Sequence, residues 1–81
     1  MQQLLLTTSQ VGQFLQSARK AAGLSQAELA ARLGLGQSRL SKLEQNPGSI
    51  TVEQLLRICG ALRLDLRIGP ASETRAPASE W

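Results

Sequence analysis

Apolar residues recur at three- and four-residue spacing along most of the chain, which predicts a series of short helices. The first predicted helix covers residues 9–22, after the cap-forming residues 7–9 and before Gly23. Its inward positions are Val11, Phe14, Leu15, Ala18 and Ala22. A second helix is predicted over residues 26–33, because Ser25 and Glu28 have the spacing of a capping box, in which each side chain binds the other residue's backbone N–H.

Residues 34–36, Gly-Leu-Gly, interrupt the helical pattern with two flexible residues around one apolar residue. Such a short turn joins packed helices at a steep angle, and a third helix is predicted over residues 37–45. Residues 46–49 have the composition of a loop, after which either Ser49 or Thr51 caps a fourth helix. The apolar side of that helix is predicted to be Leu55, Leu56, Ile58, Cys59 and Leu62.

The spacing of apolar residues changes to strict alternation over residues 62–68, which predicts a strand with one buried face. That face consists of Leu62, Leu64, Leu66 and Ile68. A lone strand leaves backbone donors and acceptors unpaired, so we expect it to pair with the same strand of a second subunit. Residues 4–8 are a weaker strand candidate. The sequence thus predicts a homodimer with a mainly α domain over residues 1–69 and a flexible Ala-, Ser- and Pro-rich tail over residues 70–81.

The size and charge of the chain fit this organisation. Its 81 residues suffice for one small domain, whose core would gain stability from oligomerisation. Eight of the nine basic residues precede Gly69, against four acidic ones, which suits an anionic partner without separating nucleic acid from a membrane surface.

Cys59 is the only cysteine and is predicted to be a small core residue. With no signal peptide or membrane span in the N-terminal residues, we expect a cytoplasmic protein.

The third predicted helix has a polar outer face opposite Leu40 and Leu43. The small residues Ser38 and Ser41 would let its backbone approach a DNA duplex closely. Donors suited to base edges or phosphates in the major groove are Gln37, Arg39 and Lys42. A polar helix face by itself is more often merely solvated, so this pattern alone leaves both interpretations open.

A longer stretch of sequence favours DNA binding over a merely solvated face. Residues 24–34, Leu-Ser-Gln-Ala-Glu-Leu-Ala-Ala-Arg-Leu-Gly, followed by residues 38–44, Ser-Arg-Leu-Ser-Lys-Leu-Glu, closely resemble the Cro/C1-type (XRE) helix-turn-helix family. The resemblance covers about residues 11–62 and implies a bundle of four to five short helices of the lambda-repressor type. In that family the second motif helix enters the major groove. Carried over by position, the residues facing bases are Gln37, Ser38, Ser41 and Lys42, and Gln26 contacts phosphate.

Two further sets of residues follow from this arrangement. The backbone N–H groups of residues 48–52, around Gly48 and Ser49, are expected to be free at the start of the fourth helix, where the helix-end field favours phosphate. Glu44 lies on the core side of the third helix, where an unpaired carboxylate would be costly, so it needs a cationic partner. Arg19 is the candidate, and the family commonly has such a pair. Arg19 and Glu44 are therefore assigned to the scaffold.

Catalysis has little basis in this sequence. It contains no His and no Tyr, and we find no cysteine cluster, Gly-rich phosphate loop or carboxylate pair at a useful spacing. We therefore expect no enzymatic activity, no cofactor and no metal.

The C-terminal part departs from most short regulators of this family, because the fourth helix leads directly to a strand and a tail that ends Ser79-Glu80-Trp81. Together with residues 44–47, this is similar to antitoxins of the HipB type. The resemblance implies dimerisation through the C-terminal strand and a Trp81 that engages a HipA-like serine/threonine kinase toxin. A stray terminal residue accounts for Trp81 equally well, although tryptophan is a frequent interface anchor.

Two functions therefore remain open, and they are compatible. One is a transcriptional repressor that is the antitoxin of a toxin-antitoxin pair and binds a palindromic operator. The alternative is a stand-alone XRE-type regulator with no toxin partner. Both require double-stranded DNA as a partner and neither requires a membrane.

Overall fold

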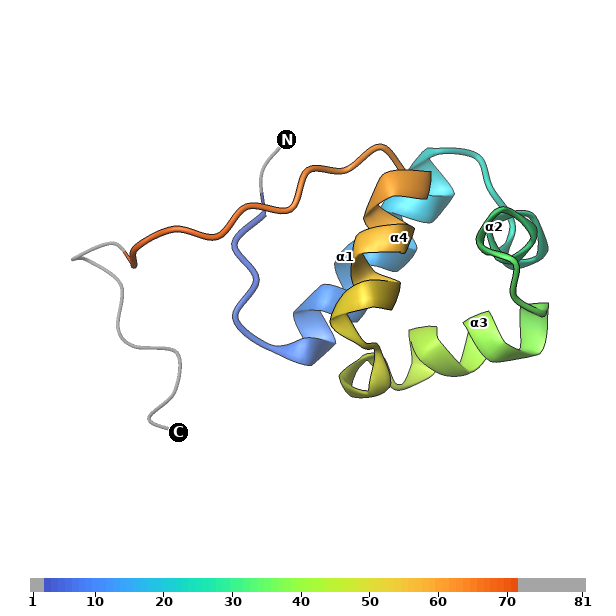
Figure 1. The fold of residues 1–81 in the computed structure, drawn as a ribbon, viewed down its shortest axis with the longest axis horizontal. Helices are drawn as coiled ribbons and strands as arrows, with labels where there is room; N and C mark the ends of the chain where they lie inside the picture. Colours follow the sequence, from blue (N-terminus) through green and yellow to red (C-terminus); the bar gives the residue numbers. More distant parts are fainter. Residues whose placement is uncertain (1–2, 72–81) are drawn as a thin grey trace.

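The computed structural model describes residues 3–71. These residues form four α-helices and one short 3₁₀ helix (Figure 1): α1 (Thr8–Ala21), α2 (Gln26–Leu33), α3 (Gln37–Gln45), η1 (Pro47–Ser49) and α4 (Val52–Ala61). The four predicted helices are thus confirmed. The longest helix has 14 residues, and none in the described part has the length and apolarity needed to cross a bilayer.

Side chains close the N-termini of three helices. Capping boxes pair Thr7 with Gln10, Ser25 with Glu28, and Thr51 with Gln54. Each box satisfies backbone donors that have no partner within the helix, and a cap of this kind stabilises by about 1 kcal/mol. The cap of α4 is therefore Thr51 and not Ser49. Helix α3 differs, because its cap residue Gly36 makes no side-chain bond.

The core lies where α1, α2, α3 and α4 meet. Its centre is formed by Leu29 and Leu40, each 1% exposed. Around them are packed Leu15, Ala30, Leu33, Ile58, Cys59 and Leu62. The prediction that Cys59 is a core residue is confirmed, and burial raises the pKa of its thiol.

The predicted apolar side of α4 is wrong at one position. Leu56 is 52% exposed, whereas Ile58 and Cys59 are buried. Successive residues of a helix are rotated by about 100°, so Leu56 falls outside the narrow stripe that contacts α2. Val52, one turn earlier, is also exposed.

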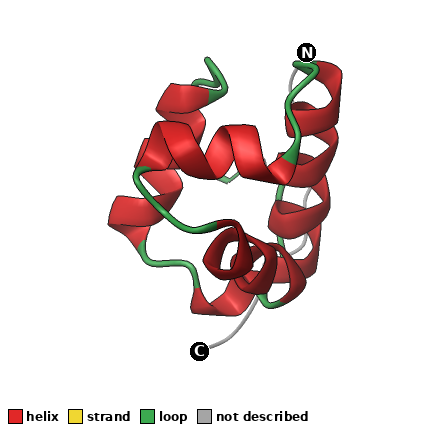
Figure 2. Ribbon diagram, turned by 90° about the vertical axis from the view of Figure 1, so that its right-hand side faces the viewer, coloured by secondary structure: helices red, strands yellow, loops and turns green. Residues whose placement is uncertain are grey.

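The predicted C-terminal strand is absent from the described residues, which Figure 2 shows as helix and loop only. Its proposed start is wrong, because Leu62 is the buried C-cap of α4 and Arg63 has a left-handed backbone with φ of 59°. From Leu64 the chain leaves the helices as an extended trace (Figure 1). A strand needs a neighbouring backbone, and the described part of one chain supplies none.

The weaker strand predicted over residues 4–8 is also wrong. Thr7 caps α1 and Thr8 is the first residue of that helix. The side-chain oxygen of Gln10 accepts the backbone N–H groups of Leu6 and Thr7, at 2.7 and 3.1 Å. These local bonds occupy donors that strand pairing would need. Most of the predicted tail, including Trp81, lies outside the described residues.

Candidate nucleic-acid interface

Helices α2 and α3 form the helix-turn-helix unit. Gly34 ends α2 with a left-handed backbone, φ 71°, which glycine adopts without steric cost. Leu35 in the turn is half-buried against the core, and its N–H donates to the Ala30 carbonyl at 2.9 Å. In Figure 1 α2 is viewed nearly end-on while α3 lies across the view, so the turn makes the steep angle that the sequence predicts.

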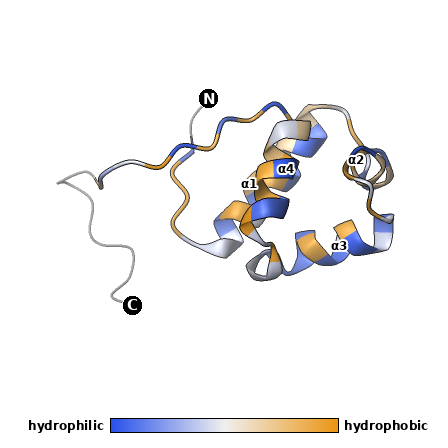
Figure 3. Ribbon diagram, in the orientation of Figure 1, coloured by the Kyte–Doolittle hydropathy of each residue, from blue (hydrophilic) through white to orange (hydrophobic). Residues whose placement is uncertain are grey.

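The outer face of α3 is polar and open to solvent. Leu40 and Leu43 are buried toward the core. Figure 3 shows hydrophobic and hydrophilic bands alternating along α3. Opposite them lie the exposed Gln37, Ser38, Lys42 and Gln45, with Ser41 half-buried beside them. We call this set, with Ser41, the α3 outer face. It brings together four of the predicted base-facing residues.

Arg39 is exposed but lies apart from that face. It borders a hollow between α2, α3 and α4, together with Leu43 and Arg57. In the same hollow the Nη2 atom of Arg57 donates to the Leu33 carbonyl at 2.6 Å, which closes the C-terminal end of α2. No role for Arg57 follows from the sequence pattern, because a lone arginine on an amphipathic helix is ordinarily just solvated.

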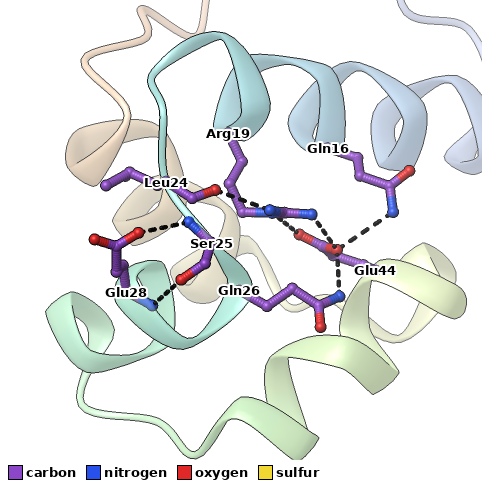
Figure 4. Close-up of polar contacts among 7 residues, drawn as sticks. All are labelled: Gln16, Arg19, Leu24, Ser25, Gln26, Glu28 and Glu44. Carbon is purple, nitrogen blue, oxygen red and sulfur yellow. Dashed lines mark hydrogen bonds and ion pairs between the residues drawn. The ribbon is translucent and has the colours of Figure 1, made fainter.

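A buried ion pair holds α3 against α1. The Nε atom of Arg19 lies 2.8 Å from Oε2 of Glu44, and the two side chains are 8% and 7% exposed (Figure 4). Arg19 also donates to the Leu24 carbonyl at 2.9 Å. The pair that the sequence predicts is therefore present, and it occupies the core side of α3 rather than the α3 outer face.

Two glutamines complete this arrangement, and their contacts with Glu44 were not predicted from the sequence. We call the four residues Gln16, Arg19, Gln26 and Glu44 the Glu44 cluster. The side-chain amide of Gln26 donates to Oε1 of Glu44 at 2.8 Å, and that of Gln16 donates to the same oxygen at 3.4 Å. Glu44 thus joins α1, α2 and α3 through its carboxylate (Figure 4). Because glutamine has no charge or apolar period to mark it, only the packed geometry identifies these partners.

The surroundings of Glu44 favour its charged form. Burial by itself would raise the pKa of this carboxyl, but hydrogen bonds from Arg19 and Gln26 and the charge of Arg19 outweigh burial and hold the pKa below its ordinary value of 4.5. The ion pair is therefore fully formed at neutral pH.

Gln26 has two possible tasks in this arrangement. It is half-buried, and one amide hydrogen is directed at Glu44. A glutamine amide nitrogen carries two hydrogens, so a second donor remains for a phosphate oxygen. The contact of Gln26 with phosphate stays a prediction. The Glu44 cluster fixes the position from which Gln26 would make it.

The prediction that the N–H groups of residues 48–52 are free is wrong for three of them. The N–H groups of Ser49 and Ile50 donate to the carbonyls of Asn46 and Pro47, and that of Thr51 donates to Gln54. The Ser49 hydroxyl also donates to Asn46, at 2.8 Å. The 3₁₀ turn and the α4 capping box consume these donors. Gly48, which is exposed, remains a candidate phosphate contact.

The comparisons with known proteins agree with this geometry. A family model described as helix-turn-helix matches residues 15–68, which include all of α2, α3 and α4. The chain belongs to this helix-turn-helix family, in its XRE branch, and is a DNA-binding regulator of that family.

Individual relatives give further detail. The chain is 36% identical over 63 residues to "Uncharacterized HTH-type transcriptional regulator y4dL" of Sinorhizobium fredii, a match that covers 78% of this chain and 32% of the relative. The chain therefore spans about a third of the length of that relative. It is 26% identical over 78 residues to Antitoxin HipB of Escherichia coli K12, covering 96% of this chain and 89% of the antitoxin. Antitoxin HipB of E. coli O6:H1 is also 26% identical over 78 residues, with 96% and 83% covered. No solved structure matches the chain.

Proposed function

We propose that the protein is a sequence-specific transcriptional repressor that binds a palindromic operator as a homodimer, with α3 in the major groove. The observation that carries this proposal is the α3 outer face, which is polar. The opposite side of α3 is fixed against the core by the buried leucines and by the Glu44 cluster. A helix that is packed so firmly on one side presents the other side in a fixed orientation.

The dimensions of α3 suit this role. An α-helix with its side chains is about 10–12 Å in diameter, and the major groove of B-DNA is about 12 Å wide, so the nine-residue α3 can enter it. Gly36 and Ser38 at its N-terminal end are small, so the backbone can come close to the base edges. Gln37, Ser38, Ser41 and Lys42 face the bases in this arrangement. Gln26, Arg39 and Gly48 lie outside this face and contact the phosphate backbone. Ser49 contacts it through its hydroxyl, whose hydrogen turns from the Asn46 carbonyl to a phosphate oxygen.

Substitutions on α3 test the proposal. An operator is first selected from random duplexes with the purified protein. Lys42→Ala and Gln37→Ala should each weaken operator binding by about 5- to 150-fold, because a specific base contact contributes about 1–3 kcal/mol. Thermal unfolding should be unchanged, since both side chains are exposed. Lys20→Ala is the matched control, an exposed lysine at the end of α1. Wild-type affinity in both α3 variants would remove α3 from the recognition role.

We further propose that the protein is the antitoxin of a HipBA-type pair, which represses its own operon and binds a HipA-like serine/threonine kinase. The likeness to Antitoxin HipB supports this, because it extends over 96% of this chain, beyond the helix-turn-helix match. Trp81 is proposed to engage the kinase. Removal of residues 78–81 should leave operator binding intact and weaken binding of the kinase encoded next to this gene, measured by calorimetry.

A stand-alone regulator is the second candidate, favoured by the 36% identity to a relative named as a transcriptional regulator. The two candidates differ in one simple observation. The antitoxin proposal requires a HipA-like reading frame beside this one, or co-purification of such a kinase from the native cell. A neighbourhood without that frame, and a protein that purifies alone, would favour the stand-alone regulator.

A further inference from the structure

The segment after α4 carries two different faces. Leu64 is half-buried against the core, whereas Leu66 is 41% and Ile68 93% exposed. Asp65 and Arg67 lie between them, 84% and 76% exposed, with their charged groups 3.6 Å apart. Figure 3 shows this alternation of hydrophilic and hydrophobic residues along the trace. We propose that residues 64–68 pair antiparallel with the same segment of a second copy, in a register whose two-fold axis passes through Leu66. This inference rests on the proposed homodimer and specifies how it forms.

The charges select that register. With the axis at Leu66, Asp65 lies directly opposite the partner's Arg67, and by symmetry Arg67 lies opposite the partner's Asp65. Directly opposed residues of an antiparallel pair have side chains on the same face, with Cβ atoms about 4.5–5.5 Å apart. The weak contact within one chain is thus replaced by two contacts between chains. The same register aligns Leu66 with its own copy, so the apolar faces also coincide.

Other symmetric registers either lack favourable charge pairs or require a backbone conformation that does not occur in a strand. An axis at Asp65 or at Arg67 sets a charged residue against its own copy, which is destabilising. An axis at Ile68 opposes no acidic residue to a basic one. An axis at Leu64 would set Arg63 against the partner's Asp65, but the left-handed backbone of Arg63 cannot belong to a strand. A shift by one residue would place leucines on the same face as charges.

Backbone hydrogen bonds are consistent with the axis at Leu66. The Leu64 N–H already donates to the Cys59 carbonyl at 2.8 Å, so Leu64 fits a position without ladder bonds to the partner. Ladder positions alternate in an antiparallel pair, which makes Leu66 a position without bonds as well. The backbones of Asp65 and the partner's Arg67 then exchange the hydrogen bonds, at the same positions where their side chains attract.

The register also provides a contact for Ile68, the most exposed large apolar side chain among the described residues. Ile68 of one copy lies opposite Leu64 of the other. Leu64 borders a groove of about 760 Å³ along α1, whose apolar lining includes Phe14, Ala18 and Leu62. Insertion of Ile68 beside this groove covers apolar surface on both copies. A second copy is therefore the occupant that matches both the charge pattern and the apolar pattern.

Cysteine cross-linking tests the register. In a Cys59→Ala background, Leu66→Cys should form an intermolecular disulfide in most of the protein under mild oxidation, because the two Cα atoms lie about 4.5 Å apart in such a pair. Ile68→Cys is the matched control. Its two copies are separated by four residues along the strands, about 13 Å, and should stay unlinked. Equal linking of both variants, or linking of Ile68→Cys alone, would overturn the register.

Charge reversal tests it without cysteines. Asp65→Arg alone and Arg67→Asp alone should each weaken dimerisation roughly tenfold, measured by sedimentation, because both opposed pairs become repulsive. An equimolar mixture of the two variants should dimerise as well as the wild type, and so should the double variant that carries both changes. A double variant as weak as the single ones would contradict the pairing of Asp65 with the partner's Arg67.

Operator binding separates this inference from the proposed function. If the register is wrong but the homodimer exists, Leu66→Cys stays unlinked while sedimentation and a two-fold footprint still report a dimer. If the proposed homodimer itself is wrong, the wild type sediments as a monomer at every concentration and protects a single half-site. Either result overturns the inference, and only the second overturns the proposed dimeric repressor.

Discussion

Replacement of Glu44 by glutamine tests how the recognition helix is held. Glu44→Gln keeps the size of the side chain but leaves the buried Arg19 charge uncompensated. Loss of one partner of a buried ion pair costs about 3–5 kcal/mol. We expect about 3 kcal/mol, since Arg19 keeps its bond to the Leu24 carbonyl and the new amide oxygen still accepts one bond. That is a large part of the roughly 4–12 kcal/mol that stabilises a domain of this size.

Thermal unfolding followed by circular dichroism measures this effect. Each kcal/mol shifts the Tm by about 4–8 °C in a small domain, so Glu44→Gln should lower it by about 12–24 °C at neutral pH. Glu53→Gln is the matched control, an exposed glutamate in the first turn of α4, and should cost less than about 1 kcal/mol. A Glu44→Gln variant as stable as the wild type would refute the scaffold role of the pair.

The pH dependence gives the same test a second readout. The pKa of Glu44 is lowered in the folded protein, so the ion pair contributes its full stability above the ordinary pKa of 4.5. This contribution declines as the pH falls through the lower, folded value. The difference between wild type and Glu44→Gln should therefore shrink on acidification below about pH 4.5. A difference that grows as the pH falls would show that the sign of the linkage is wrong.

The remaining predictions concern packing, each measured by urea unfolding. Gly12→Ala should destabilise by about 1–3 kcal/mol, because the added Cβ would lie 2.6 Å from Cγ of Pro47, whereas Gly60→Ala on α4 meets no atom within 4 Å and should stabilise by about 0.5–1 kcal/mol. Equal effects at both glycines would contradict the close approach of α1 and η1. Leu40→Ala should cost about 2–5 kcal/mol, and Leu56→Ala less than about 1 kcal/mol, because the two leucines are 1% and 52% exposed. A reversed order would mean that the buried side of α4 has been assigned incorrectly.

Local sequence signals predicted the helices well. Ser25 and Glu28 identified the start of α2, and Gly34 its end, because capping depends on residues adjacent in the chain. The pairing of Arg19 with Glu44 could also be predicted, since a carboxylate on the core side of a helix requires a cation. The existence of the four helices, and the need of Glu44 for a cationic partner, could therefore be predicted without tertiary information.

The failures have two origins, because either a partner distant in the sequence or a short local turn decides the outcome. The alternation after α4 predicts two faces, but a strand forms only beside another backbone, and the left-handed Arg63 delays its earliest start to Leu64. The N–H of Ser49 was expected to be free, yet a three-residue turn uses it locally. The contact of Gln26 with Glu44 depends on the angle between α2 and α3, which no sequence period encodes.

The footprint of the wild-type protein on its selected operator tests the central proposal most directly. Hydroxyl-radical and base-methylation interference at moderate salt should reveal two half-sites related by two-fold symmetry. Their major-groove contacts should be centred about 34 Å apart, one turn of DNA, or a multiple of that distance. Lys42→Ala should weaken protection equally in both half-sites. A single asymmetric footprint, or protection without any sequence preference, would contradict a dimeric repressor that reads DNA with α3.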